Sequence, residues 1–173
     1  MTLRPASLAD IGFIKATAGH PDNAAFVTDE DEAGLATYLT DPTARVLIWQ
    51  TPARGFAIFC DIGDPSGKVC LMRLALTAPG QGEGAAFLRA LVDFGFGALN
   101  ATRIWLDASG ENLRAQKAYT RAGFVLEGRL RQHDYVPRVG RVMDTLYYGM
   151  LRVEWLADRA GRGSGTLSPQ GSA

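Results

Sequence analysis

The sequence predicts a single α/β domain with a mixed, mostly antiparallel central sheet flanked by helices. Three observations predict this class. Hairpin-like strand runs precede residue 69, a strand, a glycine-dense turn and a helix fill residues 69–99, and a strand–helix–strand pattern follows from residue 102. The early hairpins pair strands antiparallel, whereas the later strand–helix–strand units are typical of parallel neighbours, so the sheet must be mixed. At 173 residues the chain can bury a full core as one domain.

The composition indicates which partners and which cellular compartment to expect. The 18 Lys and Arg residues balance 18 Asp and Glu residues, so we expect neither nucleic acid nor an acidic membrane as a partner. The N-terminal MTLRPASLAD has no apolar signal core, and no apolar run approaches the ~18 residues of a membrane span, so a cytoplasmic protein is expected. Cys60 and Cys70 lie in apolar runs without a CxxC pattern. We therefore expect buried thiols and no metal site.

The first 44 residues are expected to be mainly helical. The predicted elements are an edge strand at residues 2–4, a helix from Ser7 to Ala16, a break at residues 19–23 and a second helix that starts at Thr28. Ser7 with Asp10 three residues later is typical of a helix N-cap pair. Thr28 precedes four acidic residues, 29–32, which a helix dipole stabilises at an N-terminus. The same acidic run could instead attract a substrate amine.

Three strands are expected in the middle of the chain. They are residues 45–50, 55–61 and 69–76, with turns at residues 51–54 and 62–68. Residues 51–54, Thr-Pro-Ala-Arg, are typical of a hairpin. The second turn superficially resembles a nucleotide P-loop, but its spacing is one residue short and Val69 replaces the required Ser or Thr. We therefore reject a P-loop.

The last part of the chain continues the alternation of helices and strands. The expected elements are a helix after the glycine turn up to Leu99, a strand at 102–107, a helix at 111–122 that Gly123 ends, and strands at 124–130 and 142–151. The domain is expected to span residues 1–157. Residues 158–173 have the Gly- and Ser-rich composition of a flexible tail.

Three glycines at the head of the central helix predict an anion cradle. The first turn of a helix has unpaired N–H groups and the positive end of the dipole, and Gly80, Gly82 and Gly84 let the backbone approach a phosphate. A dinucleotide fold is one alternative, because Gly80-x-Gly82-x-x-Ala85 fits its fingerprint and Asp107 ends the next strand. A doubly wound sheet, however, needs more βα units than this chain supplies.

Two sequence blocks carry a family resemblance. Residues 79–84, PGQGEG, are similar to the Gln/Arg-x-x-Gly-x-Gly/Ala signature of the GNAT N-acetyltransferase superfamily. Residues 105–124 are similar to that family's strand, Asn-x-x-Ala-x-x-x-Tyr helix and Gly-Phe strand start, with Asn112 and Tyr119 in place. Residues 69–151 as a whole resemble the family's acyl-CoA-binding core, particularly in the ribosomal-protein-type branch. The resemblance implies a GNAT-like domain and an acetyl-CoA-dependent N-acetyltransferase without a metal.

The resemblance also implies roles for individual residues. The pyrophosphate of acetyl-CoA, the co-substrate, would bind the N–H groups of residues 81–85, and the pantetheine arm would pair with the central strand. Tyr119 would be catalytic, protonating the departing thiolate. The implied acetyl-CoA-binding residues are Leu74, Ala75, Leu76, Gly80, Gln81, Gly82, Glu83, Gly84, Ala85 and Asn112.

Two positions depart from the family pattern near the cradle. Pro79 stands where relatives often have Gln or Arg, which removes a contact to phosphate. Glu83 lies inside the cradle, so its side chain must point to solvent for CoA to bind well. Cations could come from the following helix instead, or these side chains could simply be solvated surface. They are Arg114, Lys117 and Arg121.

The sequence leaves the general base and the acceptor open. Relatives often carry a glutamate near the position of Cys70, and a thiol is a poor substitute. The other candidates are Asp107, His133 and Asp134. A primary amine is the expected acceptor, such as a protein N-terminus, an amino acid, a polyamine or an aminoglycoside. The alternative function is a non-catalytic CoA-binding or interaction module on the same scaffold. The sequence does not decide whether the protein forms a homodimer.

Overall fold

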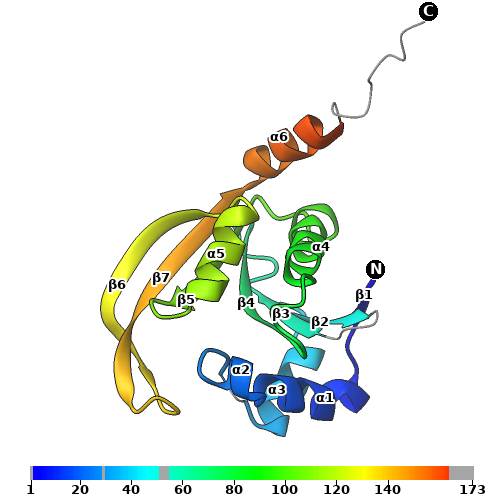
Figure 1. The fold of residues 1–173 in the computed structure, drawn as a ribbon. Coiled ribbons are helices and arrows are strands. Elements are labelled where there is room, and N and C mark those ends of the chain that lie inside the picture. Colours follow the sequence, from blue (N-terminus) through cyan, green and yellow to red (C-terminus); the bar gives the residue numbers. More distant parts are fainter. Residues whose placement is uncertain (1, 29, 51–54, 164–173) are drawn as a thin grey trace, which may run out of the picture.

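A seven-stranded sheet runs through the computed structural model, which describes residues 2–28, 30–50 and 55–163 (Figure 1). The strands are β1 (Thr2–Pro5), β2 (Arg45–Gln50), β3 (Gly55–Cys60), β4 (Lys68–Leu76), β5 (Arg103–Ser109), β6 (Val125–Val136) and β7 (Arg141–Leu151). The helices are the short 3-10 helix η1 (Leu8–Asp10), α1 (Ile11–Ala18), α2 (Pro21–Ala24), α3 (Glu32–Thr40), α4 (Gly84–Gly97), α5 (Leu113–Arg121) and α6 (Arg152–Gly163). The predicted hairpin turn at residues 51–54 lies outside the described residues.

The strand order confirms a mixed, mostly antiparallel sheet. The order is β1-β2-β3-β4-β5-β7-β6, and among the described strands β4 and β5 form the one parallel pair. This topology excludes a doubly wound dinucleotide fold, which needs a mostly parallel sheet. The described residues of β4 and β5 pair at three positions, Lys68 with Arg103, Val69 with Ile104 and Cys70 with Trp105. Beyond Cys70 the two strands part, so the sheet opens at its centre.

A β-bulge in β4 lies at the start of this opening. Phe59 of β3 pairs with Leu71, but Ile58 pairs with Arg73, so Met72 is the extra residue. Leu71 packs in the core on the α4 side, whereas Met72 packs against the core on the α1–α3 side. Because a bulge bends its strand and redirects side chains, it turns the end of β4 away from β5.

Each sheet face has its own helical layer and core (Figure 1). Helices α4 and α5 cover one face, where Phe87, Leu88 and Leu91 lie at 1% relative exposure or less. Helices α1 and α3 pack on the other face against β2 and β3, around Ile14 and Ile58. Burial of apolar surface on both faces fixes the sheet, and the site lies where the sheet opens between these layers.

The N-terminal helices differ in detail from the prediction. Helix α2 lies inside the predicted break, because Pro21 suits a first helical position and the His20 ring nitrogen accepts from the Asp22 N–H at 3.3 Å. Helix α3 starts after Asp31, not at Thr28, and the Asp31 side chain accepts from the Gly34 N–H at 2.7 Å. Acidic residues do lie at the helix start, but they are Asp31 as the cap and Glu32 in the first turn, and the cap lies three residues later than expected.

Helix α6 crosses the predicted domain end at residue 157. It continues to Gly163, because Trp155 stacks on Phe96 at 5.2 Å between ring centroids and donates to Asp93 at 2.7 Å. Residues 158–163 therefore belong to this helix, and the rest of the predicted tail, residues 164–173, lies outside the described residues. No helix in the described ranges is long and apolar enough to cross a membrane.

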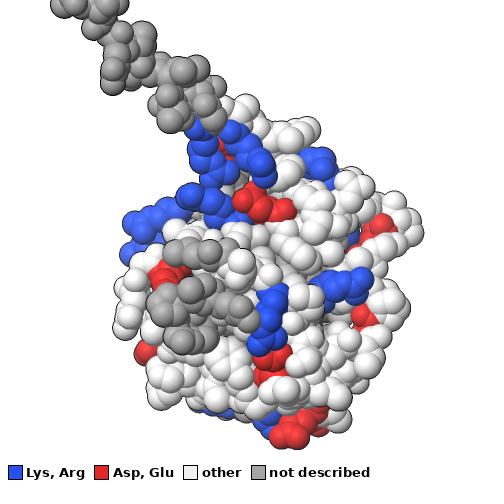
Figure 2. Space-filling view, turned by 90° about the vertical axis from the view of Figure 1, so that its right-hand side faces the viewer, with Lys and Arg blue, Asp and Glu red and all other residues white. Residues whose placement is uncertain are grey.

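Charges are balanced over the chain and interspersed on the visible surface. Figure 2 shows one face, on which basic and acidic side chains lie among a larger uncharged area. The basic side chains gather toward α6, whose sequence contains Arg152, Arg159 and Arg162. The basic side chains near α6 lie beside acidic ones, and much of the rest of the visible face is uncharged.

Candidate active site

The opening between β4 and β5 holds a cleft of about 1070 Å³. Its walls come from both faces of the sheet, because β4 and β5 stop pairing after Cys70 and Trp105. Tyr119 of α5 lines it from the α4–α5 face, and Asp107 lines it from the opposite face. The faces are assigned by alternation, since Leu106 and Ala108 pack into the core under α4 and α5 and Asp107 lies between them. Two ligands can therefore meet in the opening from opposite faces.

The predicted glycine cradle forms the N-terminal end of α4. Gly80 and Gly82 have φ of +90° and +87°, a left-handed conformation that favours glycine. A Cβ at either position would meet no described atom within 4 Å, so the space beside them is open. Gly84 begins a helix whose first N–H groups lack partners within the helix. The unpaired N–H groups at the start of α4 can thus bind an anion in the cleft.

Most of the predicted binding residues lie together along the cleft. Those that line it are Leu74, Ala75, Leu76, Gly80, Gly82, Gly84, Ala85, Asn112 and Tyr119. Gln81 and Glu83 are not among its lining residues. Glu83 is half-buried, and its Oε2 is buried without a hydrogen-bond partner among the described residues, so this oxygen does not point to solvent as good CoA binding was expected to require. Because Glu83 does not line the cleft, its side chain does not face an anion bound there.

The end of β4 offers backbone groups to a ligand, with one exception. Residues 71–76 pair with β3 on one side but lie beyond the paired part of β5 on the other. The Leu76 carbonyl already accepts from the buried Asn23 amide at 2.9 Å. A second bond from that amide to the Thr17 carbonyl, also 2.9 Å, ties α1 to the end of β4. Sequence reading missed Asn23, which looked like part of a turn.

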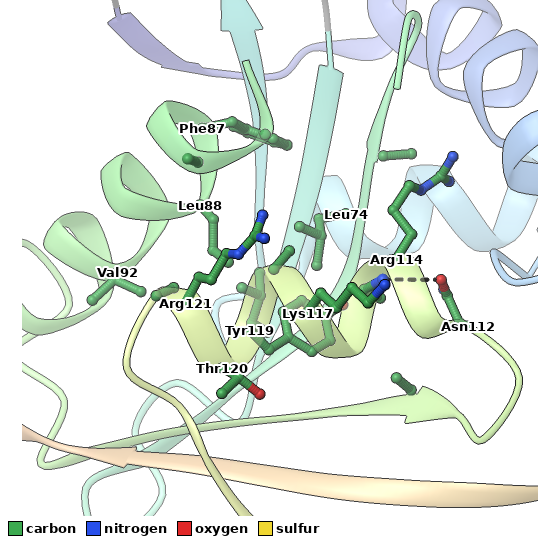
Figure 3. A pocket seen from close by; sticks show the side chains of 18 of the residues that line it. Leu74, Phe87, Leu88, Val92, Asn112, Arg114, Lys117, Tyr119, Thr120 and Arg121 are labelled. Atoms are coloured by element: carbon green, nitrogen blue, oxygen red, sulfur yellow. Dashed lines mark hydrogen bonds between the residues drawn. The ribbon is translucent and has the colours of Figure 1, made fainter. Parts of the chain in front are cut away.

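Cationic side chains of α5 stand at the rim of the cleft (Figure 3). Arg114 is engaged elsewhere, because it donates to the Asp22 carbonyl at 2.9 Å and so links α5 to α2. Lys117 and Arg121 are exposed, and the Arg121 side chain extends toward α4 in Figure 3. Of the three predicted cations, Lys117 and Arg121 are thus the better placed to attract phosphate.

Asn112 caps the helix that carries these cations. Its Oδ1 accepts from the Ala115 N–H at 3.1 Å, the bond drawn in Figure 3. The side chain also lines the cleft. The cap fixes its orientation and leaves the amide nitrogen, a donor, as the group that can serve a ligand.

Tyr119 is both a core residue and a wall of the cleft. It is 7% exposed and packs against Phe124 and Tyr148, with ring centroids 6.1 and 5.7 Å away. Burial raises the pKa of Tyr119, and the nearby charges of Asp107 and then Tyr148 raise it further. The phenol therefore stays protonated at neutral pH, which suits a proton donor.

Asp107 is a carboxylate that lines the opening from β5, the strand that parts from β4. The side chain is accessible through the cleft, but the surrounding walls limit its hydration, so desolvation raises the pKa of Asp107. The charge of Asp134 raises this pKa further, whereas Arg73 and His133 lower it. A carboxylate with a raised pKa is a better proton acceptor, so Asp107 has the properties of a general base.

Cys70 is a poor alternative to Asp107. It is 5% exposed and does not line the cleft, and burial raises the pKa of its thiol. Cys60, its partner across β3 and β4, is also a free thiol whose pKa burial raises. Within the described ranges no group of three or more His, Cys, Asp or Glu side chains could hold a metal ion.

A long bulge in β6 brings His133 and Asp134 to the cleft. Leu130 pairs with Thr145 and Asp134 with Met143, so residues 131–133 stand opposite Asp144 alone. Gln132 has φ of +49°, and the Asp144 carboxylate accepts from its N–H at 2.8 Å. The Arg129 guanidinium donates to the same carboxylate at 2.6 Å. The bulge therefore aims two consecutive side chains into one cavity, which a regular strand cannot do.

Arg73 lines the cleft on the α1–α3 side, and Glu30 holds it there through an ion pair. Their charged groups are 2.6 Å apart, and their side chains are 13% and 22% exposed. The Arg73 guanidinium also lies 6.0 Å from the centroid of the Tyr38 ring. Part of the predicted acidic run thus anchors β4, while Thr28 lines the cleft.

Comparisons with known proteins were made on this basis. Residues 16–124 match the model of the acetyltransferase (GNAT) family. The chain is 30% identical over 131 residues to the uncharacterized N-acetyltransferase Rv2669 of Mycobacterium tuberculosis, covering 67% of this chain and 81% of the relative. The uncharacterized N-acetyltransferase Mb2688 of Mycobacterium bovis gives the same figures.

Solved structures share the fold at lower identity. A spermidine N-acetyltransferase from Vibrio cholerae in complex with CoA and spermine superposes with a TM-score of 0.76, at 22% identity, over 90% of this chain and 97% of that chain. A dodecameric structure of the Vibrio cholerae spermidine N-acetyltransferase gives 0.73 at 21% identity, over 91% and 96%. At such identities the likeness establishes the fold alone.

Proposed function

Because this chain belongs to the acetyltransferase (GNAT) family and is an acetyl-CoA-dependent N-acetyltransferase, we propose that it acetylates a small primary amine by direct attack. The family resemblance seen in the sequence is thereby confirmed. Its narrower form, the ribosomal-protein-type branch, stays a prediction. Acetyl-CoA supplies the acetyl group as a thioester, so the protein must bind that donor and activate an amine.

The donor binds, in this proposal, on the α4–α5 face, which we call the donor face. The glycine cradle at Gly80, Gly82 and Gly84 holds the pyrophosphate, since unpaired helix N–H groups favour anions. Lys117 and Arg121 attract the phosphates from the rim. Asn112 and the unpaired side of β4 hold the pantetheine arm.

The amine enters from the opposite face, which we call the acceptor face and define by Asp107, Asp134 and Tyr147. Asp107 takes a proton from the ammonium group, so that the nitrogen can attack the thioester carbonyl. Tyr119 donates a proton to the departing sulfur and regains one from the nitrogen as the amide forms. One C–N bond forms, one C–S bond breaks and one proton leaves through Asp107, which balances the reaction.

One observation carries this proposal. The cleft passes through the sheet, because β4 and β5 part after Cys70 and Trp105 and residues of both faces line the opening. Tyr119 and Asp107 both line this opening, and burial and then the Asp107 charge raise the pKa of the Tyr119 phenol. A proton donor on one face and a proton acceptor on the other suit acyl transfer within a ternary complex, without a covalent enzyme intermediate.

The acceptor is proposed to be a cationic alkylamine, because the acceptor face carries two carboxylates beside an aromatic ring. Charged amines are attracted to both groups. Polyamines are the first compounds to test, since the spermidine N-acetyltransferase described above was solved with spermine. A protein N-terminus would reach the same opening only as an extended chain end, and a peptide therefore belongs in the same panel.

Thiol release from acetyl-CoA tests this function. A panel of polyamines, diamines, amino acids, an aminoglycoside and a short peptide is offered to the full chain at neutral pH. We expect turnover of at least one alkylamine and its loss in Tyr119→Phe, with mass spectrometry finding one added acetyl group on the amine. Absence of turnover across the panel, with acetyl-CoA bound, would overturn the proposed acceptor class.

A further inference from the structure

Strand β6 is built to deliver one particular carboxylate to the acceptor face. The bulge at residues 131–133 inserts extra chain opposite Asp144, and Gln132 adopts φ of +49°, which is unfavourable for a residue with a side chain. Without the insertion, alternation would place only one of His133 and Asp134 toward the cleft. Because of it, both line the cavity.

A buried hydroxyl fixes the orientation of Asp134. Thr145 of β7 is 3% exposed and donates its hydroxyl to Oδ2 of Asp134. Leu146, the next residue along, packs into the core under α4 and α5, so Thr145 faces the acceptor side. A carboxylate accepts several hydrogen bonds, so this bond orients Asp134 without exhausting it.

The two carboxylates of the acceptor face have different environments. Both side chains are solvent-accessible, but the walls of the opening limit the hydration of Asp107, whereas Asp134 lies on the edge strand β6 and accepts a hydrogen bond from Thr145. Two acids in one site whose surroundings differ in this way commonly divide the work between proton transfer and charge stabilisation. The desolvated acid is suited to accept a proton, and the solvated, oriented acid is suited to hold a cation.

We propose that Asp134 binds the ammonium group of the acceptor beside Asp107 and thereby selects amines that are cationic in solution. The inference rests on the proposed function and names the residue that sets its substrate class. The acceptor arrives protonated, forms a charge-assisted hydrogen bond with Asp134, and then transfers one proton to Asp107. Amines that are neutral at pH 7 gain nothing from Asp134.

The other charges around Asp107 do not replace Asp134 in this role. Arg73 repels an ammonium group and is paired with Glu30 at 2.6 Å. The groups that act electrostatically with Asp107 come from every neighbouring element: Cys70 and Arg73 on β4, Tyr119 on α5, His133 and Asp134 on β6, and Tyr147 on β7. Among these, Asp134 is the second carboxylate.

A pair of isomers separates charge from size in the test. Benzylamine is protonated at neutral pH, and its isomer 4-methylaniline is mostly neutral, yet both have the same atoms. Inhibition constants of both are measured against the best amine of the panel, with the wild-type chain, Asp134→Asn, Thr145→Val and the surface control Glu32→Gln. Calorimetry with acetyl-CoA checks that each variant keeps a folded donor site.

We expect the wild-type enzyme to bind benzylamine more tightly than its isomer. Asp134→Asn should weaken the binding of benzylamine about tenfold, which is the effect of one hydrogen bond to a charged group. The binding of 4-methylaniline should change less than about twofold. Thr145→Val should weaken benzylamine binding by a smaller factor and should also affect benzylamine more than 4-methylaniline. Glu32→Gln should change neither inhibition constant. Asp134→Asn should also move the acidic limb of the kcat/KM profile to lower pH, because the charge of Asp134 raises the pKa of Asp107.

The outcomes of the two proposals are distinguishable. Turnover of the panel by the wild-type chain tests the proposed function, and the isomer preference tests the role of Asp134. With turnover present, equal weakening of both isomers in Asp134→Asn would overturn the inference. A wild-type enzyme that separates the isomers by less than about twofold would overturn it as well, since one charged hydrogen bond is worth more than that.

Discussion

The donor face and the acceptor face of the cleft are built in different ways. The donor face comes from three continuous segments: the end of β4 at residues 74–76, and residues 79–85 and 112–121, each a turn followed by a helix. The acceptor face comes from single residues on separate strands, Asp107 on β5, Asp134 on β6 and Tyr147 on β7. Binding of a large, constant donor can rely on local backbone geometry, whereas recognition of the acceptor depends on individual side chains that long-range pairing brings together.

This difference explains why single substitutions should have separate effects on the two faces. The donor face binds mainly through backbone N–H groups, so side-chain changes there alter affinity in small steps unless they fill the cradle. The acceptor face acts through two carboxylates and should fail when one is neutralised. The following predictions test this separation, from the largest expected effect to the smallest.

Replacement of the proposed base should cause the largest loss. Asp107→Asn keeps the shape but cannot accept the proton, so kcat should fall about 10²–10⁴-fold, the usual contribution of a positioned general base. Acetyl-CoA affinity should stay within about twofold, because Asp107 does not touch the donor face in this account. Steady-state kinetics and calorimetry on the same preparation give both numbers. An unchanged kcat would remove Asp107 from the mechanism.

The pH profile of the wild-type enzyme tests the role of Asp107 as base, because it predicts the direction in which the acidic limb of activity is displaced. Activity requires Asp107 to be deprotonated, and its pKa is raised by desolvation and by Asp134. The acidic limb of kcat/KM should therefore lie at higher pH than an ordinary aspartate would give, and Asp107→Asn should abolish that limb. A limb at the ordinary aspartate pKa of about 3.9 would contradict the raised pKa.

Removal of the Tyr119 hydroxyl should cause the second largest loss of activity. Tyr119→Phe keeps the ring contacts with Phe124 and Tyr148, so unfolding temperature should change little. Loss of the proton donor should lower kcat by about 10²-fold, toward the low end for a general acid because water can partly substitute. Full activity in Tyr119→Phe would leave Tyr119 as a core residue only.

Strain in the cradle should have an intermediate effect. Gly82→Ala places a side chain at φ of +87°, where no described atom lies within 4 Å of the new Cβ, so the cost is conformational and not steric. We expect about 1–2 kcal/mol, divided between stability and acetyl-CoA binding. Gly128→Ala is the control, because its Cβ also meets open space and no positive φ is found there. Denaturant unfolding and calorimetry separate the two contributions.

Neutralising the rim cations should have the smallest effect. Lys117→Met with Arg121→Met should weaken acetyl-CoA about two- to fivefold at low salt, because each exposed charge contributes roughly 0.2–1 kcal/mol. The difference should shrink as ionic strength rises. Lys68→Met is the control, since Lys68 lies near Asp64, 3.5 Å away, and does not line the cleft. A salt-independent loss would assign the two side chains a packing role instead.

Local signals predicted the structural elements of the donor face, while the roles of its residues stay predictions. The bounds of β2 match the prediction, and residues of the predicted glycine turn, Asn112 and Tyr119 line the same cleft. These features depend on neighbours within one or two turns of chain, such as a positive φ at Gly80 or a cap bond to Ala115. Short-range physics therefore suffices to find them.

The remainder depends on contacts that a local pattern does not contain. The bulge that aims Asp134 into the cleft is visible only from the register between β6 and β7. Asn23 links α1 to the end of β4 across 53 residues. Residues 158–163, the second half of α6, were taken for tail from their composition, but the helix is held to the domain by contacts such as Trp155 on Phe96 and Arg159 with Asp93. The sequence proposed Asp107 and Asp134 as bases but could not assign one of them.

Calorimetric titration with acetyl-CoA tests most directly whether the two faces bind separately. Gly84→Glu puts a carboxylate into the cradle, where a Cβ has only Leu76 at 4.0 Å, so the fold can accept it. Gly97→Glu is the matched control at the other end of α4, also in open space. We predict about tenfold or greater weakening in Gly84→Glu from charge opposition, and less than about twofold change in Gly97→Glu and Asp107→Asn. Equal affinity in Gly84→Glu, or equal weakening in Asp107→Asn, would contradict the account.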